Sequence, residues 1–207
     1  LAVIFLLAFV VNANAQDSLF YRTYSFNPGC GNKAFSIDRA SDGNIIMGGG
    51  YGCAPFTNDW MFFKTNTLGD LEWFSNLESY NSPHFYDMLI TDNDEIFAVG
   101  DYWSFDGYKK GGDYYPGISK LSPQGDSLWW ISNSTEGYDT CTWNGGEYQS
   151  INKTLDGNLL VCGFKDGCTS GNKIILSKLS PGGQTLWKIT DTLYNDGWYY
   201  GFDALQA

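Results

Sequence analysis

The sequence has little positive charge and a single histidine. It contains 12 Lys and Arg residues against 23 Asp and Glu residues, a formal net charge of −11, and His84 is its only histidine. A surface with this acidic excess repels the phosphate backbone of nucleic acids, so we expect no nucleic-acid partner. No Cys-x-x-Cys pair is present, and one histidine does not complete a metal cluster, so we predict no metal site.

Sequence patterns of common enzyme active sites are also missing. There is no Gly-x-Ser-x-Gly turn to present a nucleophilic serine, and His84 is expected to be a loop histidine at a junction between repeats. Asp101, Asp106 and Asp113 occur in one stretch and are expected to be surface acids rather than a catalytic carboxylate pair. These absences disfavour catalysis.

No apolar run is long enough to span a bilayer, which takes about 20 residues. The uncharged run over residues 1–11 is followed by Ala13 and Ala15, an A-x-A pattern typical of cleavage sites. We therefore expect a signal peptide over residues 1–15, with its basic n-region missing. The mature part, residues 16–207, is then secreted or held at the cell surface and has no membrane span.

Residues that favour long helices are scarce, while aromatic residues make up 17% of the chain and glycine occurs 25 times. Aromatic residues favour strands, and glycine favours tight turns. The composition predicts an all-β protein.

Three segments carry Lys, Gly and Trp at the same offsets. The tryptophans are 56 (129 − 73) and 58 (187 − 129) residues apart, the length of a four-stranded β-propeller blade with long loops. We expect them to pack between blades and assign them no binding role. The signature residues are Lys64, Gly69, Trp73, Lys120, Gly125, Trp129, Lys178, Gly183 and Trp187.

A turn and an apolar strand precede each signature, at residues 42–49, 93–100 and 156–163. The Asp-Gly and Asn-Asp turns tolerate the positive φ angles of tight hairpins, and the apolar runs lack a polar face, as expected for strands packed on both sides. Four strands per unit follow, near 35–39, 44–51, 59–64 and 71–76 in the first unit.

The units together predict an incomplete β-propeller of four-stranded antiparallel blades. A single meander cannot bury both of its faces, so neighbouring blades must stack. We expect three complete blades, a lone fourth strand before them and a lone first strand after them, at about residues 34–78, 86–133, 148–191, 18–24 and 200–207.

These motifs resemble the repeats of secreted bacterial β-propellers of the quinoprotein-like superfamily. The resemblance covers residues 18–207 and specifies architecture rather than activity. Proteins similar to this often end in a sorting domain for type IX secretion, which implies delivery to the cell surface or medium. Quinone-dependent dehydrogenases share the Gly-x-x-x-Trp element, but their cofactor and metal ligands have no match in this sequence, so no cofactor is expected.

Five cysteines in an exported chain suggest disulfides. Cys30 and Cys141 precede the first strand of their units, whereas Cys53 and Cys168 follow the second strand, and both loops emerge on the same face of an up-and-down blade. We therefore predict the disulfides Cys30–Cys53 and Cys141–Cys168. Cys162 lies in an apolar strand and is expected to be a small buried hydrophobic residue.

The second unit carries a long aromatic insertion at residues 101–115, between its second and third strands. One expectation is an aromatic platform for a carbohydrate or a surface protein; the alternative is that the rings pack on one another to hold a long loop. The residues concerned are Tyr102, Trp103, Tyr108 and Tyr114 of the insertion, with Trp143 of the neighbouring loop that leads into the third unit.

The expected function is therefore that of a non-catalytic propeller that presents loops for recognition, in adhesion or in glycan or protein binding. The alternatives are a propeller hydrolase or lyase acting on polysaccharide, and a structural surface scaffold. An enzyme would bring at least two carboxylates, or a metal cluster, together at the axial mouth of the ring.

Overall fold

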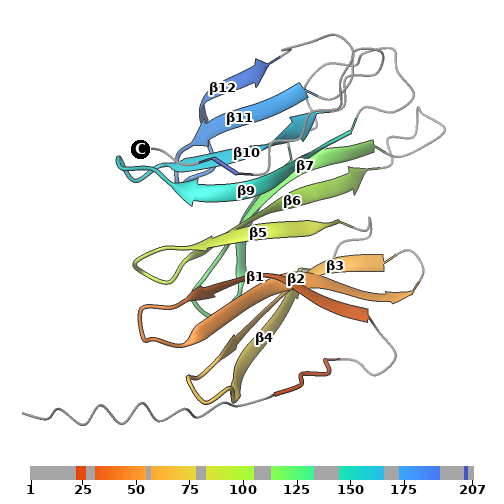
Figure 1. The fold of residues 1–207 in the computed structure, drawn as a ribbon, viewed down its shortest axis with the longest axis vertical. Helices are drawn as coiled ribbons and strands as arrows, with labels where there is room; N and C mark the ends of the chain where they lie inside the picture. The colour runs from red at the N-terminus through yellow and green to blue at the C-terminus, as the bar shows by residue number, and fades with distance from the viewer. Residues whose placement is uncertain are drawn as a thin grey trace, which may run out of the picture.

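The computed structural model describes residues 22–26, 31–54, 57–77, 83–104, 113–132, 145–165, 173–191 and 203–204. Within these residues every regular element is a strand, and twelve strands form three four-stranded antiparallel sheets (Figure 1). Neighbouring strands in each sheet are consecutive in sequence, so each sheet is an up-and-down meander, which we call a blade. The predicted all-β class is confirmed, and the arrangement is that of an incomplete propeller.

The strands of each blade run from the centre of the arrangement outward. Blade 1 contains β1 (Gly31–Arg39), β2 (Ile45–Ala54), β3 (Thr57–Thr65) and β4 (Leu71–Leu77). Blade 2 contains β5 (Phe85–Ile90), β6 (Ile96–Ser104), β7 (Asp113–Leu121) and β8 (Ser127–Ser132). Blade 3 contains β9 (Gly146–Lys153), β10 (Leu159–Lys165), β11 (Lys173–Leu179) and β12 (Thr185–Asp191). The innermost strands are neighbours, since β5 contacts both β1 and β9.

Six tight hairpins close one end of the blades. In each, the first N–H donates to the carbonyl four residues later, as from Ala40 to Asn44 at 2.8 Å. The fourth residue of each hairpin has a positive φ, between 61° and 85°, which glycine adopts without strain and aspartate tolerates. The turns predicted from Asp-Gly and Asn-Asp are therefore confirmed, at Gly43, Asp94 and Gly157.

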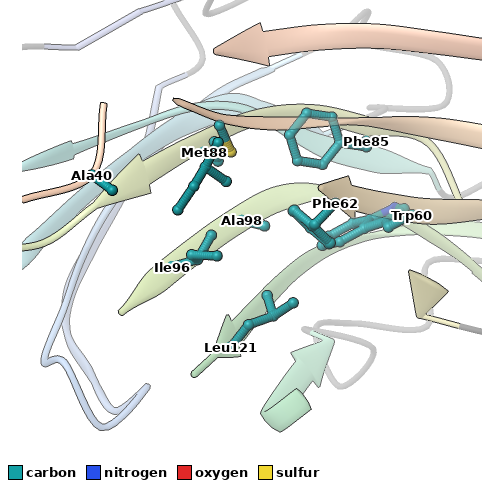
Figure 2. Close-up of a cluster of buried hydrophobic side chains, with 9 residues drawn as sticks. Ala40, Trp60, Phe62, Phe85, Met88, Ile96, Ala98 and Leu121 are labelled. Atoms are coloured by element: carbon teal, nitrogen blue, oxygen red, sulfur yellow. The ribbon is translucent and has the colours of Figure 1, made fainter. Parts of the chain in front are cut away.

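The core lies between blades rather than within them. The first core is shared by blades 1 and 2 and contains Ala40, Ile46, Trp60, Phe62, Phe85, Met88, Ile96, Ala98 and Leu121 (Figure 2). The second core is shared by blades 2 and 3 and contains Phe97, Val99, Ile118, Tyr148, Ile151, Leu159, Val161, Ile175 and Leu179. Successive side chains of a strand point to opposite faces, so β6 alternates between the two cores, which explains why its sequence has no polar face.

Residues 22–26 cover the face of blade 1 that points away from blade 2. Phe62 points into the first core, so Phe63 points to the opposite face. There the ring of Phe26 lies 5.1 Å from Phe63 and 4.1 Å from Phe74. The part of the predicted leading strand that the structure describes, residues 22–24, packs on blade 1 without strand pairing.

The predicted trailing strand is described only at Asp203 and Ala204. Asn152 Nδ2, on β9, donates to Asp203 Oδ1 and to the Ala204 carbonyl, both at 2.9 Å. This short piece therefore lies beside the innermost strand of blade 3, where the first strand of a following blade would lie.

The aromatic insertion of blade 2 lengthens the sheet. β6 continues to Ser104 and β7 begins at Asp113, with Tyr102 opposite Tyr115 and Trp103 opposite Tyr114. A loop over the whole of 101–115 was expected, but tyrosine and tryptophan favour paired strands. Only residues 105–112 of the insertion lie outside the described part.

Candidate functional site

The signature lysine of every blade pairs with an acidic residue in the first hairpin of the same blade. Such partly exposed pairs fix local geometry more than they stabilise the fold. Because the pairing recurs in each blade, it belongs to the architecture. The pairs are Lys64–Asp42 at 2.6 Å, Lys120–Glu95 at 2.7 Å and Lys178–Asp156 at 2.8 Å.

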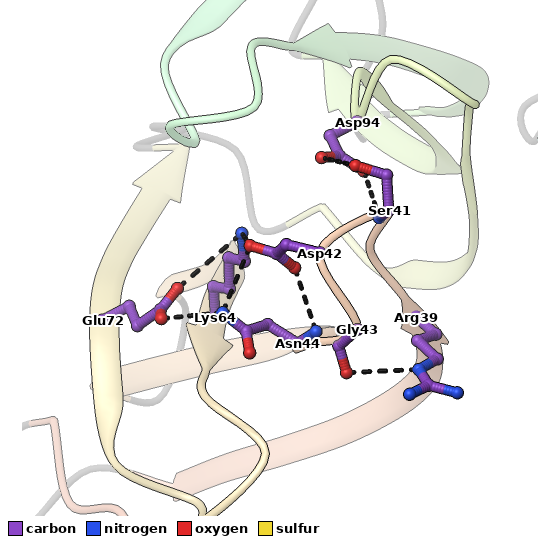
Figure 3. A network of polar contacts seen from close by, with 8 residues as sticks. All are labelled: Arg39, Ser41, Asp42, Gly43, Asn44, Lys64, Glu72 and Asp94. Atoms are coloured by element: carbon purple, nitrogen blue, oxygen red, sulfur yellow. Dashed lines mark hydrogen bonds and ion pairs between the residues drawn. The ribbon is translucent and has the colours of Figure 1, made fainter.

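In blade 1 this pair is part of a wider network (Figure 3). Lys64 Nζ also lies 3.7 Å from Glu72, and Asn44 Nδ2 donates to Glu72 Oε1 at 2.7 Å. Ser41 donates through both its backbone N–H and its hydroxyl to the Asp94 carboxylate of blade 2, at 2.7 Å each. The hairpin ends are thus tied within a blade and between neighbouring blades.

Signature glycines and tryptophans of consecutive blades meet. A Cβ on Gly125 would lie 2.9 Å from a ring carbon of Trp73, and a Cβ on Gly183 would lie 3.2 Å from Trp129. Trp73 and Trp129 pack against the first and second cores, whereas Trp187 is 40% exposed. These contacts give Gly125, Gly183, Trp73 and Trp129 a role in blade stacking.

The opposite, loop-bearing end differs from blade to blade. The first strand of each blade has a β-bulge there, at Phe35, Tyr86 and Gln149. Close by, Gly49, Gly100 and Gly163 face backbone so tightly that a Cβ would lie 1.9, 2.0 and 1.9 Å from a carbonyl oxygen. These carbonyls belong to three residues at equivalent positions: Lys33, His84 and Glu147.

His84 is held by a buried carboxylate. Its Nδ1 lies 2.9 Å from Asp101 Oδ2, and its backbone N–H donates to Asp101 Oδ1 at 2.8 Å. The Asp101 side chain is 2% exposed and the His84 side chain 41% exposed. Asp101 was expected to be a surface acid; it is buried because it follows Gly100 on the face of β6 that points toward blade 3. The imidazole is therefore oriented through Nδ1, with Nε2 as its available nitrogen.

Tyr86 joins blade 2 to blade 3 beside this pair. Its hydroxyl donates to Glu147 Oε2 at 2.7 Å, and Gln149 Nε2 donates to Glu147 Oε1. Tyr86 and Gln149 are the bulged residues of β5 and β9, and a bulge redirects a side chain. Both carboxylate oxygens of Glu147 are thereby oriented.

The pKa values of His84, Tyr86, Asp101 and Glu147 are all raised. The hydrogen bond to Asp101 raises the pKa of His84, against partial burial of the ring. Burial raises the pKa of Asp101, against the lowering by His84, and burial likewise raises the pKa of Glu147. Burial, with the nearby carboxylates, raises the pKa of Tyr86 so that its phenol stays neutral. All four groups therefore hold their protons to higher pH than the free side chains do.

Tyr114 completes the group from β7. It is 37% exposed, and its ring centroid lies 5.4 Å from that of His84. We call His84, Tyr86, Asp101, Tyr114, Glu147 and Gln149 the junction cluster. It combines an exposed aromatic face with oriented donors and acceptors, as binding sites for polyhydroxylated molecules do.

No protein family and no curated protein matches the sequence. Among solved structures, a protein of unknown function from Bacteroides caccae aligns with 86% of this chain, at 12% sequence identity and a TM-score of 0.48. The alignment covers 53% of that protein, so this chain spans about half the length of its neighbour.

The predicted aromatic platform is described in part. Tyr114 lies on the face of the sheet that points toward blade 3, whereas Tyr102 lies on the opposite face and its ring packs 4.5 Å from that of Trp130. The structure does not bring these two together. The side chains of Trp103, Tyr108 and Trp143 lie outside the described residues.

The predicted disulfides also lie outside the described part, since Cys30, Cys141, Cys168 and the side chain of Cys53 are not included. Cys162 is described and is buried, as predicted. Within the described ranges, no three His, Cys, Asp or Glu residues gather as metal ligands, and no helix there is long and apolar enough to cross a membrane.

The sequence prediction missed Asp101 as the partner of His84 and Glu147 as a member of the same cluster. One signal was available in the aligned units. Asp101 follows the last residue of the apolar strand, where blade 1 has Gly50 and blade 3 has Phe164. A charged residue that departs from the repeat at one blade only marks a site that architecture does not require.

Proposed function

We propose that the chain is an extracellular, propeller-like protein that binds a neutral glycan at the junction cluster. The observation that carries the proposal is the half-exposed Tyr114–His84 face beside the oriented Glu147 carboxylate. Aromatic faces pack against the C–H groups of sugar rings, while carboxylate and imidazole groups bind their hydroxyls. The net charge of −11 disfavours anionic polysaccharides.

Export supports the extracellular setting of this proposal. The A-x-A pattern at Ala13 and Ala15 and the resemblance to secreted bacterial propellers of the quinoprotein-like superfamily both favour delivery to the surface or medium, by the type IX route in that resemblance. N-terminal sequencing of the exported protein tests it, with Gln16 as the expected first residue.

Titration calorimetry with soluble galactomannan, xyloglucan and laminarin, and with anionic alginate for comparison, tests the binding. We expect one neutral glycan to bind and Tyr114→Ala to weaken its binding about fivefold or more, since an aromatic contact of this kind contributes about 1 kcal/mol. Lys153→Ala is the matched control: it removes an exposed ion pair with Asp92 at the hairpin end and should leave binding unchanged. Equal affinity in Tyr114→Ala, or no binding of any neutral glycan, overturns the proposal.

A further inference from the structure

We propose that the junction cluster also hydrolyses the glycan that it binds, with His84 donating a proton to the leaving oxygen and Glu147 activating the attacking water. This inference rests on the binding proposed above and goes beyond it. The sequence favoured a non-catalytic protein. For an enzyme, we expected at least two carboxylates, or a metal cluster, together at the axial mouth of the ring. The junction cluster supplies one partly buried carboxylate, Glu147, and an oriented imidazole, His84, while the second carboxylate, Asp101, is buried against Nδ1 of that imidazole.

The first step of the argument is the orientation of His84. Asp101 is almost fully buried and binds Nδ1, so the proton available for transfer is the one on Nε2. A buried carboxylate at Nδ1 also stabilises the imidazolium form. Asp101 does not reach the substrate in this scheme, so it is a positioning residue.

The second step is the placement of Glu147 opposite His84. His84 immediately precedes β5 and Glu147 lies in β9, at equivalent positions of neighbouring blades. Tyr86 connects them, because its ring centroid lies 6.4 Å from that of His84 and its hydroxyl donates to Glu147 Oε2 at 2.7 Å. Tyr86 and Gln149 hold one oxygen each of the Glu147 carboxylate, which fixes its direction. A sugar bound across the junction of blades 2 and 3 therefore has an acid on one side and a base on the other.

The reaction is a single displacement in which all bonds and protons balance. The Glu147 carboxylate takes a proton from water as the water oxygen bonds to the anomeric carbon. The bond from that carbon to the leaving oxygen breaks, the electron pair stays on the oxygen, and this oxygen takes the proton from His84 Nε2. Exchange with solvent returns a proton to His84 and removes one from Glu147. One displacement inverts the anomeric configuration.

The protonation states required are the ones that the surroundings favour. His84 faces Tyr86 of the adjoining strand β5, Asp101 from β6, Tyr114 from β7 and Glu147 from β9. Between the pKa of Glu147 and that of His84, the carboxylate is charged and the imidazole protonated. Activity should therefore fall at low pH as Glu147 gains a proton and at high pH as His84 loses one.

The test compares two kinds of substrate: the neutral polysaccharide that binds, assayed by release of reducing ends, and 2,4-dinitrophenyl glycosides of glucose, galactose, mannose and xylose. A dinitrophenolate leaves without protonation. We expect His84→Ala to lose about a hundredfold or more of its rate on the polysaccharide and to stay within about tenfold on a dinitrophenyl glycoside. Glu147→Gln should lose both activities, and Asp101→Asn should move the alkaline limb of the pH profile to lower pH.

Wild-type measurements keep the inference testable even if a variant fails to fold. Proton NMR of the first product should show inverted configuration; retention overturns the displacement. Binding without release of reducing ends overturns the inference and leaves the proposed function standing, whereas absence of binding removes both. Equal losses on the two substrates in a folded His84→Ala protein overturn the proton-donor role.

Discussion

The hairpin end and the loop end of the blades differ in how closely their residues repeat from blade to blade. At the hairpin end, each blade repeats a lysine paired with an acidic residue of the first hairpin and a turn residue with positive φ. At the loop end, the equivalent positions carry Lys33, His84 and Glu147, three side chains of different charge. A feature that every blade repeats is required by stacking, whereas one that varies at a fixed position is available for function.

The electrostatics of the two ends differ in the same way. Hydrogen bonds from lysine lower the pKa values of Asp42, Glu95 and Asp156 at the hairpin end. At the loop end, burial raises those of Asp101 and Glu147. The surroundings stabilise the charged form of the carboxylates at the hairpin end and destabilise the charged form of those at the loop end. Carboxylates whose charged form is destabilised by burial are typical of functional sites.

The largest effect should come from a glycine at the loop end that every blade repeats. Such an effect would indicate that a residue repeated in every blade is structural even at the end where other positions vary. In Gly100→Ala the new Cβ would lie 2.0 Å from the His84 carbonyl oxygen and 2.8 Å from the Trp60 ring. Backbone cannot yield by that distance, so we expect a loss of about 4 kcal/mol or more and a fall in Tm of about 10 °C or more.

Gly157→Ala is the matched control, because a Cβ there meets nothing within 4 Å and only the φ of 79° resists it. It should cost roughly 1 kcal/mol. Similar Tm values for the two variants in thermal unfolding would contradict the close contact at Gly100.

A smaller effect should separate two signature tryptophans that occupy the same position in the repeat. Trp129 packs against the second core and beneath the Gly183 turn of blade 3, so Trp129→Ala should cost about 3 kcal/mol. Trp187 is 40% exposed in this chain, and Trp187→Ala should cost less than half as much. Denaturant unfolding of both variants measures the difference. Equal costs would mean that Trp187 is covered as well as Trp129.

The fold was predictable because its information is local and repeated. Hairpins of five residues, the spacing from Lys64 to Trp73 and the apolar runs before them each lie within a few residues of sequence, and three copies reinforce one another. Strand ends were less predictable: β6 and β7 extend into the aromatic insertion because Tyr102 and Tyr115 pair, which depends on tertiary context.

The site was largely hidden because it depends on register. His84 and Asp101 are 17 residues apart and meet only through the pairing of β5 with β6. Glu147 comes from another blade, and the bulges at Tyr86 and Gln149 shift which face their side chains take. A single unpredicted bulge reverses inward and outward positions, so residue spacing alone does not bring these groups together.

A still smaller effect should appear when the buried carboxylate of the junction cluster, Asp101, is neutralised. Asp101→Asn removes the main cause of the raised His84 pKa, so histidine titration by NMR should give a lower pKa than in the wild type. The folded-state pKa of His84 is raised, so its stabilisation is full below about pH 6.5 and is lost as pH rises through the folded value.

The raised pKa of Asp101 acts in the same direction, because the charged carboxylate is the disfavoured form in the folded state. The variant should therefore be roughly 1 kcal/mol less stable than the wild type at pH 5, with a smaller difference at pH 8. An unchanged His84 titration would show that Asp101 does not control the imidazole.

The smallest effect should come from the hairpin end, and it should have the opposite dependence on pH. The hydrogen bond from Lys178, helped by Thr154, lowers the pKa of Asp156. A lowered folded-state pKa gives stabilisation that is present above about pH 4 and is lost as pH falls. Asp156→Asn should thus change Tm by no more than about 2 °C at pH 7 but flatten the decline of Tm between pH 5 and pH 2. Parallel declines in wild type and variant would show that the signature pairs contribute nothing to acid sensitivity, and the contrast between the two ends would then be one of geometry alone.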